Sequence, residues 1–179
     1  NEEPLDLMGH GTNVAGVIAG KLTGVAPECT LYSLKIGEAG NFSVSNLYEA
    51  LKWCIENRDR LKIDLINMSL SINSYDYTLK NLCKKVYEEG MILVAAAGNN
   101  GSGAQFPAAL EEVISVGSVN NINRRSKFSN IWPTLDICAP GELIFTTGSC
   151  NEESYKNAYE ESRGTSLSTP IVTGIIALG

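Results

Sequence analysis

Apolar residues along the chain recur at two spacings, one typical of strands and one typical of helices. The runs at residues 30–36 and 63–69 predict two short strands. Between them, apolar side chains recur at helical spacing behind Ser43 or Ser45, either of which can cap a helix. These side chains are Val44, Leu47, Leu51, Cys54 and Ile55. The order of strand, helix and strand predicts a βαβ unit.

The same alternation continues further along the chain. A helical face precedes an apolar strand at 91–97, and further strands are predicted at 113–119 and around 135–146. The residues of that helical face are Leu79, Leu82, Cys83, Val86 and Tyr87. Strands that are almost continuously apolar are typical of a parallel sheet covered by helices on both faces.

Two helices rich in small residues are predicted near the ends of the chain, at 10–20 and 166–178. Small side chains allow such helices to approach their neighbours closely. Pro170 is expected in the first turn of the second helix, where proline is tolerated. Together the elements predict an α/β fold of three layers, with a mainly parallel β-sheet flanked by helices.

The composition narrows the class of protein. The chain has 179 residues, of which 44% are hydrophobic and 19% charged, as expected of one folded domain and not of a disordered chain. Its apolar stretches are far shorter than the roughly 20 residues of a membrane-spanning helix, so no membrane insertion is expected. The net charge of -6 gives no attraction for phosphate backbones, which argues against nucleic acid as a partner.

The chain contains five cysteines, and no two of them have the spacing of a zinc or redox motif. Because the number is odd, at least one thiol has no partner within the chain. Cys54 and Cys83 fall on the apolar faces of predicted helices. This favours small buried side chains in a reducing compartment over a disulfide framework.

Three polar residues stand at junctions between strands and helices, where ligands bind in open parallel sheets. His10, the only histidine, is a candidate general base, although a lone histidine is more often a surface or core residue. Ser166 is either a nucleophile or a helix N-cap. Asn99 is either an amide donor to a developing negative charge or a turn residue.

Six segments together resemble the signature blocks of the subtilisin-like serine proteases. The resemblance runs from His10 to the end of the chain, with the blocks in the family's order and at comparable spacings. The blocks are HGTNVAGVIAG (10–20), GVAP (24–27), INMSLS (66–71), VAAAGNNG (94–101), LDICAPG (135–141) and GTSLSTP (164–170).

The resemblance implies a serine endopeptidase that hydrolyses peptide bonds through an acyl-enzyme. His10 matches the family's general base, Ser166 its nucleophile and Asn99 its oxyanion-hole amide. The resemblance also implies an extended polypeptide substrate, with a propeptide or inhibitor as a further partner. No cofactor is expected, and no metal, because the chain lacks the calcium loop described below. The implied substrate-binding residues are an edge formed by Ser69, Leu70 and Ser71, and a wall of the specificity pocket formed by Ala96, Ala97 and Gly98.

The chain departs from the family's pattern at three places, of which the replacement of Met and Ala by Leu167 and Ser168 is expected to affect packing rather than chemistry. The family's catalytic aspartate lies on an earlier strand, well before the histidine, whereas Asp6 is too close to His10 for that role. We therefore expect residues 1–179 to be a partial subtilisin-like peptidase domain that lacks the aspartate-bearing strand and the C-terminal end. The segment 20–23 has neither the length nor the oxygen ligands of the calcium loop that many relatives carry.

Other functions are compatible with the same residues. A pseudoprotease that binds extended peptides or regulates a partner predicts no aspartate upstream, and a self-processing maturation factor would share every block. Nucleotide handling is disfavoured because the glycine-rich segments lack the P-loop and dinucleotide patterns. The location stays open, since secretion is usual in the family whereas unpaired cysteines favour an intracellular protein.

Overall fold

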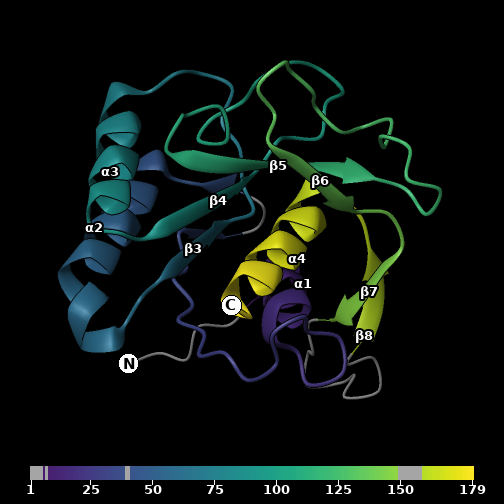
Figure 1. Cartoon of the computed structure of the whole chain (residues 1–179), viewed down its shortest axis with the longest axis horizontal. Coiled ribbons are helices and arrows are strands. Elements are labelled where there is room, and N and C mark those ends of the chain that lie inside the picture. The colour runs from purple at the N-terminus through teal and green to yellow at the C-terminus, as the bar shows by residue number, and fades with distance from the viewer. Residues whose placement is uncertain (1–5, 7, 39–40, 149–158) are drawn as a thin grey trace.

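A sheet of parallel strands with helices on both faces forms the centre of the protein (Figure 1). The computed structural model describes residue 6 and residues 8–38, 41–148 and 159–179. The strand order is β3-β4-β5-β6, and every neighbouring pair is parallel. The strands are β3 (Leu65–Met68), β4 (Ile92–Ala96), β5 (Val113–Val119) and β6 (Ile137–Pro140). The predicted α/β class with a mainly parallel sheet is confirmed.

The helices cover the two faces of this sheet in pairs. α2 and α3 pack together on one face, and α1 and α4 pack together on the other (Figure 1). The helices are α1 (His10–Ala19), α2 (Val44–Leu61), α3 (Tyr77–Glu88) and α4 (Thr165–Ala177). Within the described ranges, none of them combines the length and apolar character needed to cross a membrane.

β4 illustrates why the central strands are apolar throughout. Leu93 and Ala95 join a buried cluster with residues of α2 and α3, whereas Val94 packs with Val172 of α4. Successive side chains of a strand point to opposite faces of a sheet. Because both faces of β4 are buried, both sets of side chains must be apolar.

Four short strands lie outside the central sheet. They form two antiparallel pairs, β1 (Gly37–Glu38) with β2 (Asn41–Phe42), and β7 (Ile144–Thr147) with β8 (Tyr159–Ser162). The strand predicted around 135–146 is therefore two strands, β6 and β7, in different sheets. α1 packs closely on β7, as expected of a small-residue helix. Gly16 permits this approach, because a Cβ at that position would collide with Thr146 and Thr147.

The prediction of a strand at residues 30–36 is wrong. In the described chain these residues pair with no strand, and Leu31, Tyr32 and Leu34 are exposed. An isolated segment cannot form the hydrogen-bond ladder that defines a strand, whatever its apolar pattern. The βαβ unit of the structure is instead β3-α3-β4.

The described cysteines are free thiols, and Cys150 lies outside the described residues. Cys54 and Cys83 are buried in the cluster between α2, α3 and the sheet, as predicted. Burial raises the pKa of Cys54 to about 11 and that of Cys83 to about 12. Both thiols therefore stay protonated at neutral pH and act as small core side chains.

Candidate active site

α4 begins at the carboxyl ends of the central strands. Its N-cap is Gly164, whose φ of 137° lies in a region that favours glycine. The Gly164 N–H donates to the carbonyl oxygen of Gly141, just after β6, at 2.9 Å. Ser166 therefore lies inside the first turn of the helix, and its interpretation as the N-cap is wrong.

Ser166 is half-buried and is joined to Ser69 by two hydrogen bonds. Ser166 Oγ donates to the carbonyl oxygen of Ser69 at 3.3 Å, and Ser69 Oγ donates to the carbonyl oxygen of Ser166 at 2.8 Å. Pro170 explains the second bond, because it has no N–H to offer the Ser166 carbonyl one turn before it. Pro170 thus lies in the second turn of α4 and not, as predicted, in the first.

The Asn99 side chain holds the start of α4 against the end of β4. Its Oδ1 accepts hydrogen bonds from Thr165 N at 2.8 Å and from Thr165 Oγ1 at 3.0 Å. Asn99 does not adopt the left-handed backbone that the turn interpretation requires, whereas Gly98 does, at φ 105°. Sequence reasoning missed the buried Thr165, although it stands in the GTSLSTP block; its hydroxyl also accepts from Gly98 N at 3.2 Å.

Two N–H groups border the space beside Gly164. A Cβ on Gly164 would lie 3.3 Å from Asn99 Nδ2 and 3.7 Å from Ser166 N. Because Asn99 Oδ1 is engaged by Thr165, the amide nitrogen is the atom that is left to face this space. Two N–H donors that border one space can stabilise an oxygen that develops negative charge there, as in an oxyanion hole.

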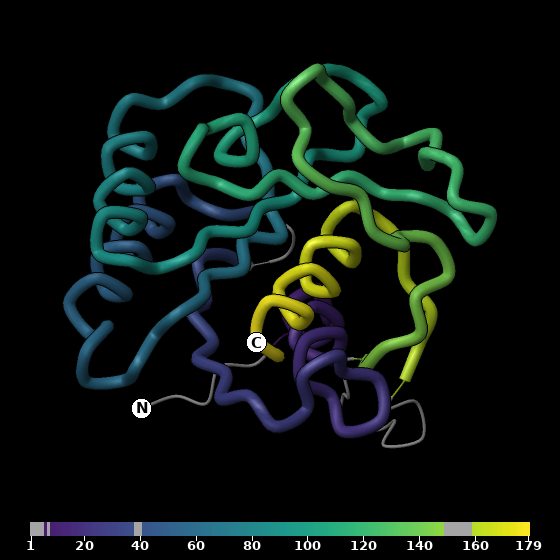
Figure 2. Tube along the Cα trace, in the orientation of Figure 1, coloured from purple at the N-terminus to yellow at the C-terminus, as the bar shows by residue number. Residues whose placement is uncertain are grey.

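His10 is the first residue of α1, and its side chain is exposed. Desolvation lowers the pKa of His10 from its ordinary value of 6.5, and the nearby Asp6 carboxylate opposes this effect. The imidazole is therefore neutral at neutral pH, as a general base must be. α1 packs against α4 (Figure 2). In the described chain no hydrogen bond joins His10 to Ser166, so the base role stays a prediction.

Asp6 caps the N-terminus of α1. Its Oδ2 accepts from Thr12 N and Thr12 Oγ1, both at 2.8 Å, and its Oδ1 accepts from Gly9 N at 2.9 Å and Met8 N at 3.3 Å. Partial burial raises the pKa of Asp6, but these hydrogen bonds outweigh it, so the pKa lies below the ordinary 3.8. In the described residues, the hydrogen bonds of the Asp6 carboxylate all lie at the N-terminus of α1, and none of them joins it to His10.

We expect Asp6→Ala to lower the free energy of unfolding by about 1 kcal/mol at neutral pH, the usual cost of losing a helix cap. Because the pKa of Asp6 is lower in the folded state, its contribution is present above about pH 4 and is lost as the pH falls through the folded pKa. Denaturant unfolding at neutral pH and near pH 3 measures the difference. Asp59→Ala, at a side chain that is 92% exposed, is the control. An equal cost at both pH values would contradict the cap.

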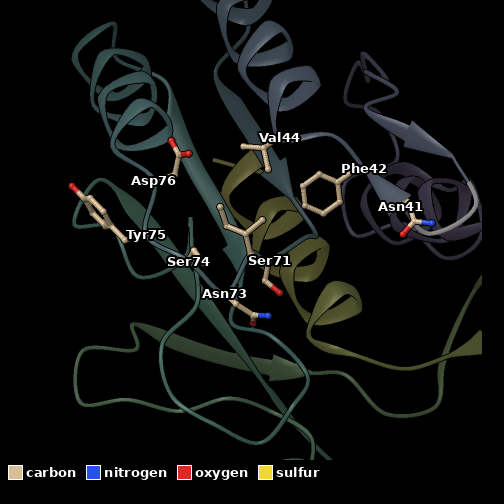
Figure 3. A pocket seen from close by; sticks show the side chains of 9 residues that line it. Asn41, Phe42, Val44, Ser71, Asn73, Ser74, Tyr75 and Asp76 are labelled. Carbon is tan, nitrogen blue, oxygen red and sulfur yellow. The ribbon is translucent and has the colours of Figure 1, made fainter.

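The predicted substrate-binding residues lie directly after β3 and at the end of β4. Leu70 packs partly on the core, and Ser71 lines a cavity of about 510 Å³ together with residues before α2 and before α3 (Figure 3). The cavity is lined by Asn41, Phe42, Val44, Ser71, Ile72, Asn73, Ser74, Tyr75 and Asp76. Ala96, Ala97 and Gly98 are buried and lead the chain into Asn99. Of these six described residues, only Ser69 forms side-chain hydrogen bonds with Ser166.

The described residues contain no group of three His, Cys, Asp or Glu side chains that could hold a metal ion. The segment 20–23 is a tight turn, in which Gly24 N donates to Gly20 O at 2.7 Å and Thr23 Oγ1 donates to Gly16 O at 2.8 Å.

Comparison with known proteins matches the whole chain, residues 1–179, to the family model described as the subtilase family. The chain belongs to the subtilase family. Its relatives include subtilisin DY of Bacillus licheniformis, 36% identical over 97% of this subtilase chain, and the major intracellular serine protease of Bacillus subtilis (strain 168), 38% identical over 97%. Alkaline protease 1 of Aspergillus clavatus is 38% identical over 96%.

This subtilase chain spans only part of these relatives. It covers 64% of subtilisin DY, 55% of the intracellular protease and 42% of the Aspergillus protease. The family is therefore established for residues 1–179, and the activity of the whole protein is a matter for proposal.

Proposed function

We propose that the protein is a serine endopeptidase with Ser166 as nucleophile and His10 as general base. The observation that carries the proposal is the pair of N–H groups of Asn99 and Ser166 beside Gly164, next to the Ser166 hydroxyl. A nucleophile beside two such donors suits attack on a carbonyl, whose oxygen becomes negatively charged in the transition state. Family membership gives the same reaction class.

In the proposed reaction, Ser166 Oγ attacks the peptide carbonyl carbon while His10 takes the hydroxyl proton. Asn99 Nδ2 and Ser166 N donate hydrogen bonds to the resulting oxyanion. The C–N bond then breaks, and His10 gives its proton to the departing amine. Water, deprotonated in turn by His10, hydrolyses the acyl ester and restores Ser166.

An extended polypeptide is the proposed substrate. The segment Ser69–Ser71 would pair with the substrate backbone, and the cavity beside Ser71 would take one of its side chains. Ala96, Ala97 and Gly98 would form one wall of the pocket next to the scissile bond, since they lie between the buried part of β4 and Asn99.

The orienting carboxylate is proposed to lie upstream of residue 1, on a strand outside this chain. A second candidate function, a pseudoprotease that binds peptides without cleaving them, is favoured by one observation. Both carboxylate oxygens of Asp6, the acidic residue nearest to His10 in the described sequence, already accept hydrogen bonds at the N-terminus of α1. Without an oriented imidazole, turnover falls by about 10⁴-fold in this family.

Labelling with a serine-directed fluorophosphonate distinguishes these functions. We expect weak labelling of the 179-residue chain and strong labelling of a chain extended at its N-terminus by roughly 40 to 60 residues, about one βα unit and a strand. The label should map to Ser166 by peptide mass spectrometry. Circular dichroism shows whether each chain is folded.

Each other outcome has a definite meaning. Strong labelling of both chains would show that Asp6 or another local carboxylate orients His10. Labelling of neither folded chain would overturn the endopeptidase proposal in favour of the pseudoprotease.

A further inference from the structure

A cavity lined by basic side chains opens beside the start of α4. Its volume is about 430 Å³, and its walls come from the turn after β5, from the residue after Gly141, and from the residue before Gly164. It is lined by Asn120, Ile122, Arg124, Arg125, Lys127, Phe128, Glu142 and Arg163. With four cationic side chains and one carboxylate, the basic cavity is positive in a chain whose net charge is -6.

The charges of the basic cavity are not neutralised by the protein. In the part of the chain that the structure describes, the side chains of Arg124, Lys127 and Arg163 form no ion pair and no hydrogen bond. Arg125 donates to the carbonyl oxygen of Ser129 at 2.5 Å, and no carboxylate of the described residues lies within ion-pair distance of it. Unpaired cations that share one concave site attract an anionic group.

The turn that carries three of these cations is held in place by its own backbone. Asn120 N donates to Arg124 O at 2.8 Å, Asn120 Oδ1 accepts from Arg124 N at 3.0 Å, and Ser126 N donates to Ser118 O at 2.9 Å. The guanidinium and ammonium groups are therefore presented from a fixed base, which reduces the entropy lost when a ligand binds.

The basic cavity lies across α4 from the Ser69–Ser71 segment. Along the sheet order, Ser69–Ser71 follows β3 at one edge, whereas the basic turn follows β5 and Glu142 lies beyond β6 at the other. Glu142 and Arg163 flank the hydrogen-bonded pair Gly141 and Gly164, and Gly164 borders the Asn99 amide. A peptide that crosses the start of α4 from Ser69–Ser71 thus arrives at the basic cavity.

We propose that the basic cavity binds an acidic side chain of the polypeptide substrate, on the side of the scissile bond that departs as the amine. This inference rests on the proposed function, with Ser69–Ser71 taken to pair with the acyl half of the peptide, so that the departing half crosses α4 toward the basic cavity. Aspartate or glutamate fits the charge of Arg124, Lys127 and Arg163, and the half-buried Phe128 and exposed Ile122 give contact for its methylene groups.

Binding of fluorescent peptides to the full polypeptide that contains residues 1–179, carrying Ser166→Ala, tests the proposal without requiring turnover. The peptides share one acyl half and carry Glu, Ala or Lys at the first three positions of the departing half. We expect the Glu peptide to bind about three- to tenfold more tightly than the Ala peptide, and the Lys peptide more weakly, as for a few partly exposed ion pairs. Raising the salt concentration should reduce the preference.

A double variant, Arg124→Glu with Lys127→Glu, should abolish or reverse the preference. The control, Lys52→Glu with Lys84→Glu, changes the net charge equally on exposed faces of α2 and α3 and should keep it. Equal binding of the Glu and Ala peptides, failure of the Glu peptide to bind, or equal effects of the two double variants would each overturn the proposal. Cleavage of the Ala peptide by the unmodified protein reports separately on the proposed peptidase activity.

Discussion

Ser166→Ala is expected to reduce turnover by about 10⁶-fold in the full polypeptide, the loss known for subtilisin when its nucleophile is removed. Alanine deletes the hydroxyl that we propose attacks the carbonyl and leaves the helix intact, because the Ser166 side chain is not the N-cap of α4. Peptide binding and the free energy of unfolding should change little. Steady-state hydrolysis of a fluorogenic peptide, together with denaturant unfolding, measures both.

Ser168→Ala is the matched control for this variant. Ser168 lies two residues further along the same helix, is buried, and donates its hydroxyl to the carbonyl oxygen of Pro140 at 3.1 Å. Its loss should cost about 1 kcal/mol of stability and leave turnover within a few-fold of the original. A Ser166→Ala variant as active as the Ser168→Ala variant would remove Ser166 from the nucleophile role.

Asn99→Ala is expected to reduce turnover by about 10²- to 10³-fold, the range known for the oxyanion-hole asparagine of subtilisin. The structure adds a second cost, because Asn99 Oδ1 also accepts hydrogen bonds from Thr165 N and Thr165 Oγ1. Loss of this helix contact should lower the free energy of unfolding by about 1 kcal/mol. Peptide affinity should change far less than turnover.

Asn99→Asp separates the two effects. Aspartate keeps an oxygen acceptor for Thr165 but has no N–H to offer an oxyanion, so stability should recover while turnover stays low. If Asn99→Asp were as active as the original protein, the amide donor would have no catalytic part. The role of Asn99 would then be limited to positioning α4.

Periodicity predicted the elements whose partners are close in sequence or buried on both faces. β5 spans the expected residues 113–119, and α2 and α3 contain the expected apolar stripes. The segment 30–36 carries the same kind of pattern, but a strand also needs a neighbour, and the apolar pattern contains no information about one. β8 was missed because a strand of four residues with two exposed glutamates resembles a loop.

The site was predictable in its residue types and not in its contacts. The blocks around His10, Asn99 and Ser166 identify candidates, yet the hydrogen bonds between Ser69 and Ser166 join positions 97 residues apart. The same is true of the Asn99–Thr165 contact, which argues against the alternative that Asn99 is only a turn residue. Such contacts depend on the docking of α4 onto the sheet, which no local pattern encodes.

The position of α4 affects the order in which the protein folds as it is synthesised on the ribosome. α4 is the last helix of residues 1–179, and it contacts β3, β4, β5 and β6. Until residues 165–177 have been synthesised and have docked, Val94 and Val116 cannot pack against Val172 of α4. The Ser69 carbonyl oxygen likewise cannot accept the hydrogen bond from Ser166 Oγ. Contacts of such long sequence separation form late. A growing chain thus carries His10 long before Ser166, and the proposed catalytic pair can come together only after α4 has docked.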